Sequence, residues 1–544
     1  MNSSVAAPAA AGLRWHGLGL WNLYFLGEFA LVWQGVLNFQ ALPNLLLVAV
    51  LLLPLPRWAA HLRTLLAVPA GLALLYRQSW LPPLARLLEH RDELREFSAA
   101  YVLELAERVF DWQWLGAAAL LLLGYRLLAP WLRLTTLSLG GLLWLAVPAL
   151  PGAAPAPTAP LQAAAPAAGS APAPAPAADG PPDSAALERY LGDFYQREGA
   201  RQVDFAAAQP GPAFDLLLLH ICSMSWDDLR AVGLDQHPLL QRLDIRFDDF
   251  NSATAYSGPA ALRLQRASCG QSSHAALYEP APPRCQLFEQ LARLGYRTDL
   301  VLNHDGRFDN YLQSIRASGN LPAPLFPVSS LPRALVGFDA SPIARDRDAL
   351  DAWQRQRQDD PAARVSLLYQ SITLHDGNRR LLADGGTRSA DYGERARNLL
   401  DDLDAFLGEL ERRGRPTVVV LIPEHGAALK GDRLQIAGLR EIPTPSITHI
   451  PVGVKLVGLP LAGGAPQRVA APSSYLALTE LFARLYAGPP AGQGGFDLAA
   501  LVRDLPQTAR VAENSGSVVL DYAGQTYVRL QERGQWLPYP QNGR

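Results

Sequence analysis

The sequence predicts an N-terminal α-helical transmembrane bundle, followed by an exported α/β domain with a largely parallel central sheet. Long apolar runs crowd the first 150 residues, and short β-rich runs alternate with helical patterns after residue 184. The chain of 544 residues leaves room for two or three compact units. The 48 Lys and Arg nearly balance the 50 Asp and Glu, which excludes the basic footprint of a nucleic-acid-binding protein.

The first predicted domain, residues 1–150, contains apolar runs of roughly membrane-spanning length. A bilayer core needs about 20 mostly apolar residues per helix, and with their flanks the runs reach this length. Buried soluble helices and a cleaved signal peptide are the alternatives. Five successive runs argue against the first, and no small-residue cleavage site follows the first run, which argues against the second. The five runs are residues 20–39, 42–56, 62–76, 114–128 and 135–151.

Arginines in the short loops predict the orientation. Arg14 precedes the first run, Arg57 and Arg63 lie around the junction of the second and third runs, and Arg126 and Arg133 lie around the junction of the fourth and fifth runs. The positive-inside rule therefore places the N-terminus in the cytoplasm, and five spans export the rest of the chain. Residues 86–112 would lie on the exported side as an acid-rich amphipathic helix. Glu28 lies in mid-span, and a functional role, protonation or a partner on a neighbouring helix all remain open.

Residues 151–183 are rich in Ala and Pro and predict an extended, semi-rigid linker. Residues 184–544 then form a soluble block within the reach of one α/β domain. Its apolar runs are continuous rather than alternating, which is typical of strands covered on both faces in a mostly parallel sheet. These runs are residues 214–221, 298–302, 365–374, 417–422 and 450–458.

Possible metal ligands and proton carriers follow three of these strand runs. Cys222 follows the first, His375 and Asp376 follow the third, and Glu424 and His425 follow the fourth. Ligands of such sheets bind just beyond the carboxyl ends of the strands. A residue of this kind after a single strand is more often an ordinary loop residue, but the joint placement of these residues predicts a functional site.

The chain has three cysteines. Cys269 and Cys285 bound a short loop whose Pro and Gly content suits a disulfide in an exported domain. Cys222 is then left over, either as a buried inert thiol or as a thiolate protected by a bound cation. Cys, Glu and His together with a hydroxyl make a tetrahedral zinc site. Zinc beside a serine would stabilise the alkoxide and polarise a phosphoryl oxygen.

Residues 250–271 contain several hydroxyl groups in front of a predicted helix. Ser257 precedes a Gly-Pro pair, and Pro259 is well placed for the first helical turn. The positive end of the helix would favour both an alkoxide at Ser257 and a phosphate bound to it. An N-capping role for Ser257 is the alternative. Ser252 and Thr254 are rival nucleophiles that the spacing does not exclude.

The chain resembles the cellulose phosphoethanolamine transferases of the BcsG family in four stretches, ICSMSWDDL, NSATAYSGPAALRLQRASCGQ, SITLHDGNR and IPEHGAALKGDRLQIAGLREIPTPSITHIPVGVKL. The resemblance extends over nearly the whole chain. It implies a multi-pass protein of the bacterial inner membrane, with a periplasmic alkaline-phosphatase-like domain and cellulose synthase subunits as partners. The implied reaction moves phosphoethanolamine from phosphatidylethanolamine to the 6-hydroxyl of glucose units in cellulose.

The resemblance also implies roles for individual residues. Ser257 would be the nucleophile that carries the covalent phosphoethanolamine, and it would complete a zinc site with Cys222, Glu424 and His425. Substrate or phosphate handling would fall to Tyr256, His375 and Arg440. The resemblance likewise implies the disulfide Cys269–Cys285. A phosphatase- or sulfatase-like hydrolase, a lipid A-type phosphoethanolamine transferase and a mainly structural subunit of the secretion complex remain as alternatives.

Overall fold

Two compact units make up the chain, one within residues 1–86 and 104–174 and the other within residues 87–103 and 175–544. The predicted linker lies outside the described residues, except for its last two positions. The computed structural model describes residues 17–33, 37, 39–79, 97–109, 112–147, 182–205, 211–432, 434–490, 492, 494–530 and 534–539.

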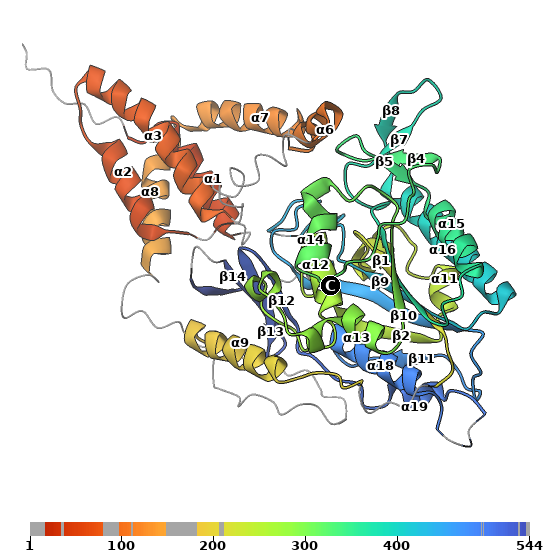
Figure 1. The fold of residues 1–544 in the computed structure, drawn as a ribbon. Coiled ribbons are helices and arrows are strands. Elements are labelled where there is room, and N and C mark those ends of the chain that lie inside the picture. The colour runs from red at the N-terminus through yellow and green to blue at the C-terminus, as the bar shows by residue number, and fades with distance from the viewer. Residues whose placement is uncertain are drawn as a thin grey trace, which may run out of the picture. The chain divides into compact units, whose positions relative to one another are not determined.

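The first unit is helical over most of its described residues (Figure 1). Within the described part of the chain, α3 is the one helix long and apolar enough to cross a membrane, over Trp58–Gln78. Shorter apolar helices accompany it, so the predicted five spans and their orientation stay predictions. The helices are α1 (Trp21–Trp33), α2 (Ala41–Leu52), α3 (Arg57–Gln78), α7 (Trp112–Leu128) and α8 (Leu134–Ala146), while α6 (Ala99–Val109) begins in the second unit.

Buried polar side chains join α1, α2 and α3. The carboxylate Oε1 of Glu28 accepts a hydrogen bond from Gln78 Nε2 at 2.7 Å, and Asn44 Nδ2 donates to Gln78 Oε1 at 3.0 Å. All three side chains are buried, and polar groups removed from water need such partners. Gln78 is therefore the partner on a neighbouring helix that the sequence left open for Glu28.

The second unit is built on a mixed sheet of seven strands in the order β11-β2-β10-β9-β1-β6-β3 (Figure 1). Four of its six pairings are parallel, and β10 runs antiparallel to both of its neighbours. The prediction of a largely parallel sheet therefore holds except at β10. The strands are β1 (Asp215–Ile221), β2 (Ile245–Asn251), β3 (Arg297–Leu302), β6 (Val365–Ser371), β9 (Thr417–Pro423), β10 (His449–Val457) and β11 (Gln467–Val469).

Helices cover both faces of this sheet, which explains the continuous apolar runs. Along β1, Leu216 and Leu218 enter one core while Leu217 and Leu219 enter the other, as the alternation of a strand requires. The first core is closed by α12 (Ser257–Gln265), α13 (Leu287–Arg293), α14 (Tyr311–Ala317), α18 (Tyr475–Ala487) and α19 (Leu498–Val502). The second is closed by α10 (Trp226–Ala231), α11 (Pro238–Gln241), α15 (Asp346–Gln358) and α16 (Tyr392–Arg413).

Two smaller antiparallel sheets flank this layer structure, and the sequence analysis did not predict them. One packs on α9 (Ser184–Gly199) and consists of β12 (Val511–Asn514), β13 (Ser517–Tyr522), β14 (Gln525–Leu530) and β15 (Trp536–Pro538). The other consists of β4 (Arg333–Val336), β5 (Pro342–Ala344), β7 (Arg379–Leu381) and β8 (Thr387–Ser389). Short helical turns complete the unit: η2 (Ala275–Tyr278), η3 (Pro283–Cys285), η4 (Phe308–Asn310) and α17 (Pro445–Thr448).

The predicted disulfide between Cys269 and Cys285 is confirmed, and Cys222 is a free, buried cysteine. The bridge spans a sequence separation of 16 and closes the loop that follows α12. It thus ties down the segment behind the helix that begins at Ser257.

Replacing Cys269 and Cys285 together by serine should lower the free energy of unfolding by about 3 kcal/mol, because the unfolded chain regains the entropy of an open loop of this length. Urea unfolding of the two proteins measures the difference. Peptide mapping without reductant should recover the two cysteine peptides joined. Finding Cys222 in a disulfide would contradict the pairing of Cys269 with Cys285, and it would also contradict a role of Cys222 as a metal ligand.

Candidate active site

The carboxyl ends of β1 and β9 bring the predicted metal ligands together. Cys222 directly follows β1, and Glu424 and His425 directly follow β9, its parallel neighbour. The Cys222 N–H donates to the Ser371 carbonyl at the end of β6, and the Glu424 N–H donates to the Ile221 carbonyl. One ligand atom from each of the three residues lies within 4.8 Å of the other two, and all three residues are buried.

Ser257 joins this group as the first residue of α12. Its Oγ lies 3.4 Å from both Cys222 Sγ and His425 Nε2, and the residue is partly exposed. Tyr256 occupies the N-cap position, so the alternative role of Ser257 as an N-cap is wrong. The hydroxyl therefore stands at the positive end of a helix, where an alkoxide or a phosphate is stabilised.

The rival hydroxyls have structural partners in the same loop. Ser252 and Thr254 are fully buried. Ser252 Oγ donates to the Thr254 carbonyl at 3.0 Å, and Thr254 Oγ1 donates to Asn514 Oδ1 at 3.2 Å. Both residues hold the loop in front of α12, and the geometry favours Ser257 as the reacting group.

The group of side chains fits a zinc ion. Glu424 Oε2 is buried and has no hydrogen-bond partner among the described residues, which is costly for a carboxylate unless a cation lies beside it. A thiolate, a carboxylate, an imidazole and a hydroxyl oxygen form the donor set of a tetrahedral zinc site with a reactive fourth position. His425 Nε2 faces this group, while Nδ1 lies 2.9 Å from the Gly426 carbonyl, which orients the ring.

The charges of the metal ligands are set by burial and by each other. Burial and the neighbouring Glu424 raise the pKa of the Cys222 thiol to about 12. Burial would also raise the pKa of Glu424, but His220 and His425 outweigh it and lower the value to about 2. Burial and Arg440 lower the pKa of His425 to about 3. Without a metal, the group at neutral pH is thus one thiol, one carboxylate and one neutral imidazole.

A layer of polar side chains that the sequence analysis missed supports Glu424. His220 Nδ1 lies 3.2 Å from Glu424 Oε1, and Gln370 Nε2 donates to the same oxygen at 3.1 Å. Gln370 Oε1 in turn meets His304 Nε2, and His304 Nδ1 accepts from the Gly306 N–H. These side chains lie in or just after apolar strands. The signal that could have found them is a buried His or Gln inside an otherwise apolar strand.

The loop that carries His425 is held by Asp228. Asp228 forms a capping box with Ser225 at the start of α10, and it also accepts from the Ala427 N–H at 2.7 Å. A Cβ on Gly426 would lie 2.7 Å from Ser225 Cβ and 2.8 Å from Asp228 Oδ2. Only glycine therefore allows this close approach, which fixes the backbone next to His425.

Arg440 and Tyr256 lie beside the metal ligands. Arg440 Nη1 donates to Ser223 Oγ at 3.3 Å and lies 3.1 Å from His425 Nδ1. Its guanidinium carbon lies 5.6 Å from the centre of the Tyr256 ring, and the Tyr256 hydroxyl donates to Glu441 Oε1 at 2.7 Å. The cation–π contact holds a planar, positively charged donor next to His425, and such a donor suits a phosphate.

His375 lies in the loop after β6. Its Nδ1 is 2.8 Å from the Asp376 carbonyl, which leaves Nε2 as the nitrogen that can exchange a proton. The ring stacks on Phe338 with a centroid distance of 4.5 Å. Burial and the nearby charge of Arg440 lower the pKa of His375 to about 4, so the neutral imidazole is its resting form.

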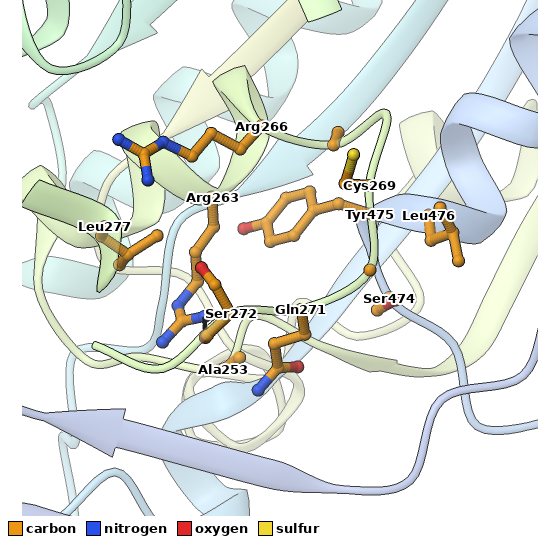
Figure 2. A pocket seen from close by; sticks show the side chains of 12 residues that line it. Ala253, Arg263, Arg266, Cys269, Gln271, Ser272, Leu277, Ser474, Tyr475 and Leu476 are labelled. Atoms are coloured by element: carbon orange, nitrogen blue, oxygen red, sulfur yellow. Dashed lines mark hydrogen bonds between the residues drawn. The ribbon is translucent and has the colours of Figure 1, made fainter. Parts of the chain in front are cut away.

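A separate cavity of about 20 Å³ lies behind the other end of α12 (Figure 2). Arg263, Arg266, Tyr475 and the disulfide-bonded Cys269 are among the residues that line it. Its volume suits about one water molecule and no substrate, so this cavity is not a candidate catalytic site.

The whole chain is similar to known cellulose biosynthesis proteins. Residues 21–147 match the family model of the BcsG N-terminal domain, and residues 172–536 match that of the BcsG C-terminal domain. The cellulose biosynthesis protein BcsG of Escherichia coli is 43% identical over 561 residues, which cover 99% of each chain. BcsG of Salmonella typhimurium is 43% identical over 553 residues, which cover 98% of each chain.

One solved structure is similar to part of this chain. It is a protein of the alkaline phosphatase superfamily from Vibrio parahaemolyticus, with 13% sequence identity and a TM-score of 0.45. The match covers 65% of this chain and 91% of that protein.

Zinc binding to the metal-free protein should release at least one proton near neutral pH. The Cys222 thiol must become a thiolate, whereas Glu424 and His425 are already unprotonated there. The apparent affinity should therefore rise at least about tenfold for each pH unit between about pH 6 and pH 8. Calorimetry in buffers of different ionisation enthalpy counts the protons. Equal zinc affinity in Cys222→Ala would remove Cys222 from the ligand set.

Gln370→Leu should weaken zinc binding about 10- to 100-fold, because Glu424 loses the hydrogen bond that orients it. Gln354→Leu is the matched control, since Gln354 is another buried glutamine, on α15. Competition with a chelator of known affinity measures both variants. An equal loss of affinity in the two proteins would show general damage instead of a supporting role for Gln370.

Proposed function

The chain belongs to the BcsG family of cellulose biosynthesis proteins, and on this premise we propose that it transfers phosphoethanolamine from phosphatidylethanolamine to the 6-hydroxyl of glucose units in cellulose. The observation that carries the proposal is the placement of Ser257. A partly exposed hydroxyl at a helix N-terminus lies 3.4 Å from two buried metal-type ligands, Cys222 and His425. A purely structural domain has no use for this arrangement.

The proposed setting is the bacterial inner membrane, with five N-terminal spans, a cytoplasmic N-terminus and a periplasmic catalytic domain. The apolar helix α3 supports membrane anchoring, and the disulfide fits an oxidising compartment. The linker of residues 151–183 would reach about 100 Å when fully extended as polyproline II. This reach suits a domain that acts on a polymer leaving the cellulose synthase complex, whose subunits are the proposed partners.

Zinc is the proposed cofactor. Cys222, Glu424 and His425 would hold it, with Ser257 as the fourth ligand. When bound, it supplies a Lewis acid that favours the alkoxide of Ser257 and polarises a phosphoryl oxygen. The buried Oε2 of Glu424, which lacks a hydrogen-bond partner among the described residues, supports this assignment.

In the first proposed step, the Ser257 hydroxyl gives its proton to water and its Oγ attacks the phosphorus of phosphatidylethanolamine. The bond between phosphorus and the glycerol oxygen breaks, and diacylglycerol leaves with a proton from His375 Nε2. A bound phosphate favours the imidazolium form of His375 needed for this transfer. The planar fork of Arg440 neutralises the phosphoryl oxygens, and Tyr256 holds Arg440 in place.

In the second proposed step, the 6-hydroxyl of a glucose unit attacks the phosphoserine-type intermediate. His375 Nε2 takes the proton of this hydroxyl, as the reversal of its role in the first step requires. The bond between phosphorus and Ser257 Oγ breaks, and the Ser257 oxygen takes a proton back from water, which restores the hydroxyl. One acceptor pocket used twice is sufficient for such a ping-pong reaction.

Ser257→Ala should abolish the transfer and leave the fold intact, because Ser257 is not the N-cap and its loss costs less than the about 1 kcal/mol of a capping residue. After incubation with phosphatidylethanolamine, intact-mass analysis of the wild-type protein should show one added phosphoethanolamine on Ser257. Thr254→Ala is the matched control. It should lower stability by about 1–2 kcal/mol through its lost hydrogen bond, yet still become labelled.

The acceptor is tested separately in cells that make cellulose. Solid-state phosphorus and carbon NMR should show phosphoethanolamine on the polysaccharide with wild type and none with Ser257→Ala. A labelled Ser257 together with unmodified cellulose would contradict the acceptor. Release of free phosphoethanolamine into water as the main product would instead indicate a hydrolase.

A further inference from the structure

A segment that precedes the linker packs on the loop of His375. The described residues 97–103 belong to the same compact unit as the catalytic sheet, and we call them the aromatic strap. Within the strap, the Ser98 N–H donates to the Phe338 carbonyl at 2.9 Å. The Tyr101 hydroxyl donates to Asp376 Oδ2 at 3.0 Å. Two hydrogen bonds thus connect residues that lie about 240 and 275 positions apart in the chain.

Aromatic rings carry this contact to His375. Phe338 stacks on the imidazole of His375 with an interplanar angle of 27°. Phe97 and Tyr101 pack against Phe338, at centroid distances of 5.7 and 6.0 Å. Phe308 closes the cluster at 4.3 Å from Phe338. The strap thus supplies two of the four rings of an aromatic cluster centred on Phe338, whose ring stacks on the side chain proposed to move the proton.

The loop is shaped to receive Tyr101. Gly377 has a φ of +75°, and a Cβ added there would lie 2.5 Å from the Tyr101 ring. Tyr101 itself is buried at 7% exposure. Its hydroxyl holds the side chain of Asp376, and the backbone carbonyl of the same residue accepts from His375 Nδ1. Tyr101 therefore fixes the position of Asp376, and the backbone carbonyl of Asp376 orients the imidazole of His375.

We propose that Tyr101 is a positioning residue, through which the aromatic strap aligns His375 Nε2 with the leaving oxygen of the donor. This inference rests on the proposed function, in which His375 supplies a proton in the first step. Proton transfer depends on placement within a fraction of an ångström, so a loosened imidazole lowers the rate without changing how the donor is held. Residues upstream of the linker are then part of the catalytic apparatus and more than a membrane anchor.

The test uses the full chain and two donors that differ in their need for an acid. Phosphatidylethanolamine has a glycerol leaving group that must be protonated, whereas a p-nitrophenyl ester of phosphoethanolamine has a leaving group that needs no proton. Tyr101→Phe should slow the labelling of Ser257 by phosphatidylethanolamine about tenfold, with little change in KM. The release of p-nitrophenol should stay within about twofold of wild type.

Three further proteins serve as controls. Phe97→Leu, which keeps an apolar side chain, should show the same selective loss in weaker form. Val102→Ala, on the exposed side of the strap, should leave both rates unchanged. Adding Tyr101→Phe to His375→Ala should cost nothing beyond His375→Ala alone, because the two residues act as one unit.

Equal losses with both donors, or a further loss in the His375→Ala background, would overturn the positioning role. An unchanged rate in Tyr101→Phe, together with a strong defect in His375→Ala, would overturn this inference and leave the proposed function standing. A normal rate in His375→Ala would overturn the role of His375 itself and the inference with it.

Discussion

The common edge at which three parallel strands end is the constraint on which the rest of the site depends. Ile221, the last residue of β1, pairs with Ser371 of β6 on one side and with Pro423 of β9 on the other. The residues that directly follow these strands therefore lie side by side along one edge of the sheet. A slip of β1 by a single residue would move Cys222 by about 3.3 Å and turn it toward the opposite face of the sheet. The packing of leucines on both faces of β1 prevents such a slip.

Within the described part of the chain, this alignment buries the carboxylate of Glu424 with too few hydrogen-bond donors around it for both of its oxygens. Glu424 is buried, and its Oε1 is held by His220 and Gln370, while Oε2 lacks a hydrogen-bond partner among the described residues. The hydrogen bond from Gln370 and the close imidazole of His220 offset part of the cost of burying the carboxylate, and a cation at the other oxygen would offset the rest. The protein thus keeps a charged carboxylate in a buried site, beside a thiol whose pKa burial and Glu424 raise to about 12.

Local sequence patterns predicted the strand runs, the ligands that follow them and the disulfide, because each of these is a property of neighbouring residues. The antiparallel direction of β10 was missed, since an apolar run carries no sign of its direction. His220 and Gln370 were missed because a polar residue within an apolar strand is more often a satisfied core residue. The C-terminal sheet was missed as well, although Asn514 of β12 donates to the backbone carbonyls of Arg440 and Glu441 and so holds the backbone of Arg440 in place.

Two parts of the chain connect the apolar N-terminal residues to the catalytic domain, and they differ in physical character. The Ala/Pro composition of the linker determines how far the linker can extend, but its small side chains offer little for a specific contact. The aromatic strap has the opposite character, because Phe97 and Tyr101 make defined ring contacts and a hydrogen bond beside His375. A membrane anchor alone would need only the linker. The side chains of the strap pack on Phe338 and Asp376, the two residues that contact the ring of His375, so in the proposed mechanism residues upstream of the linker help to position the proton-transferring side chain.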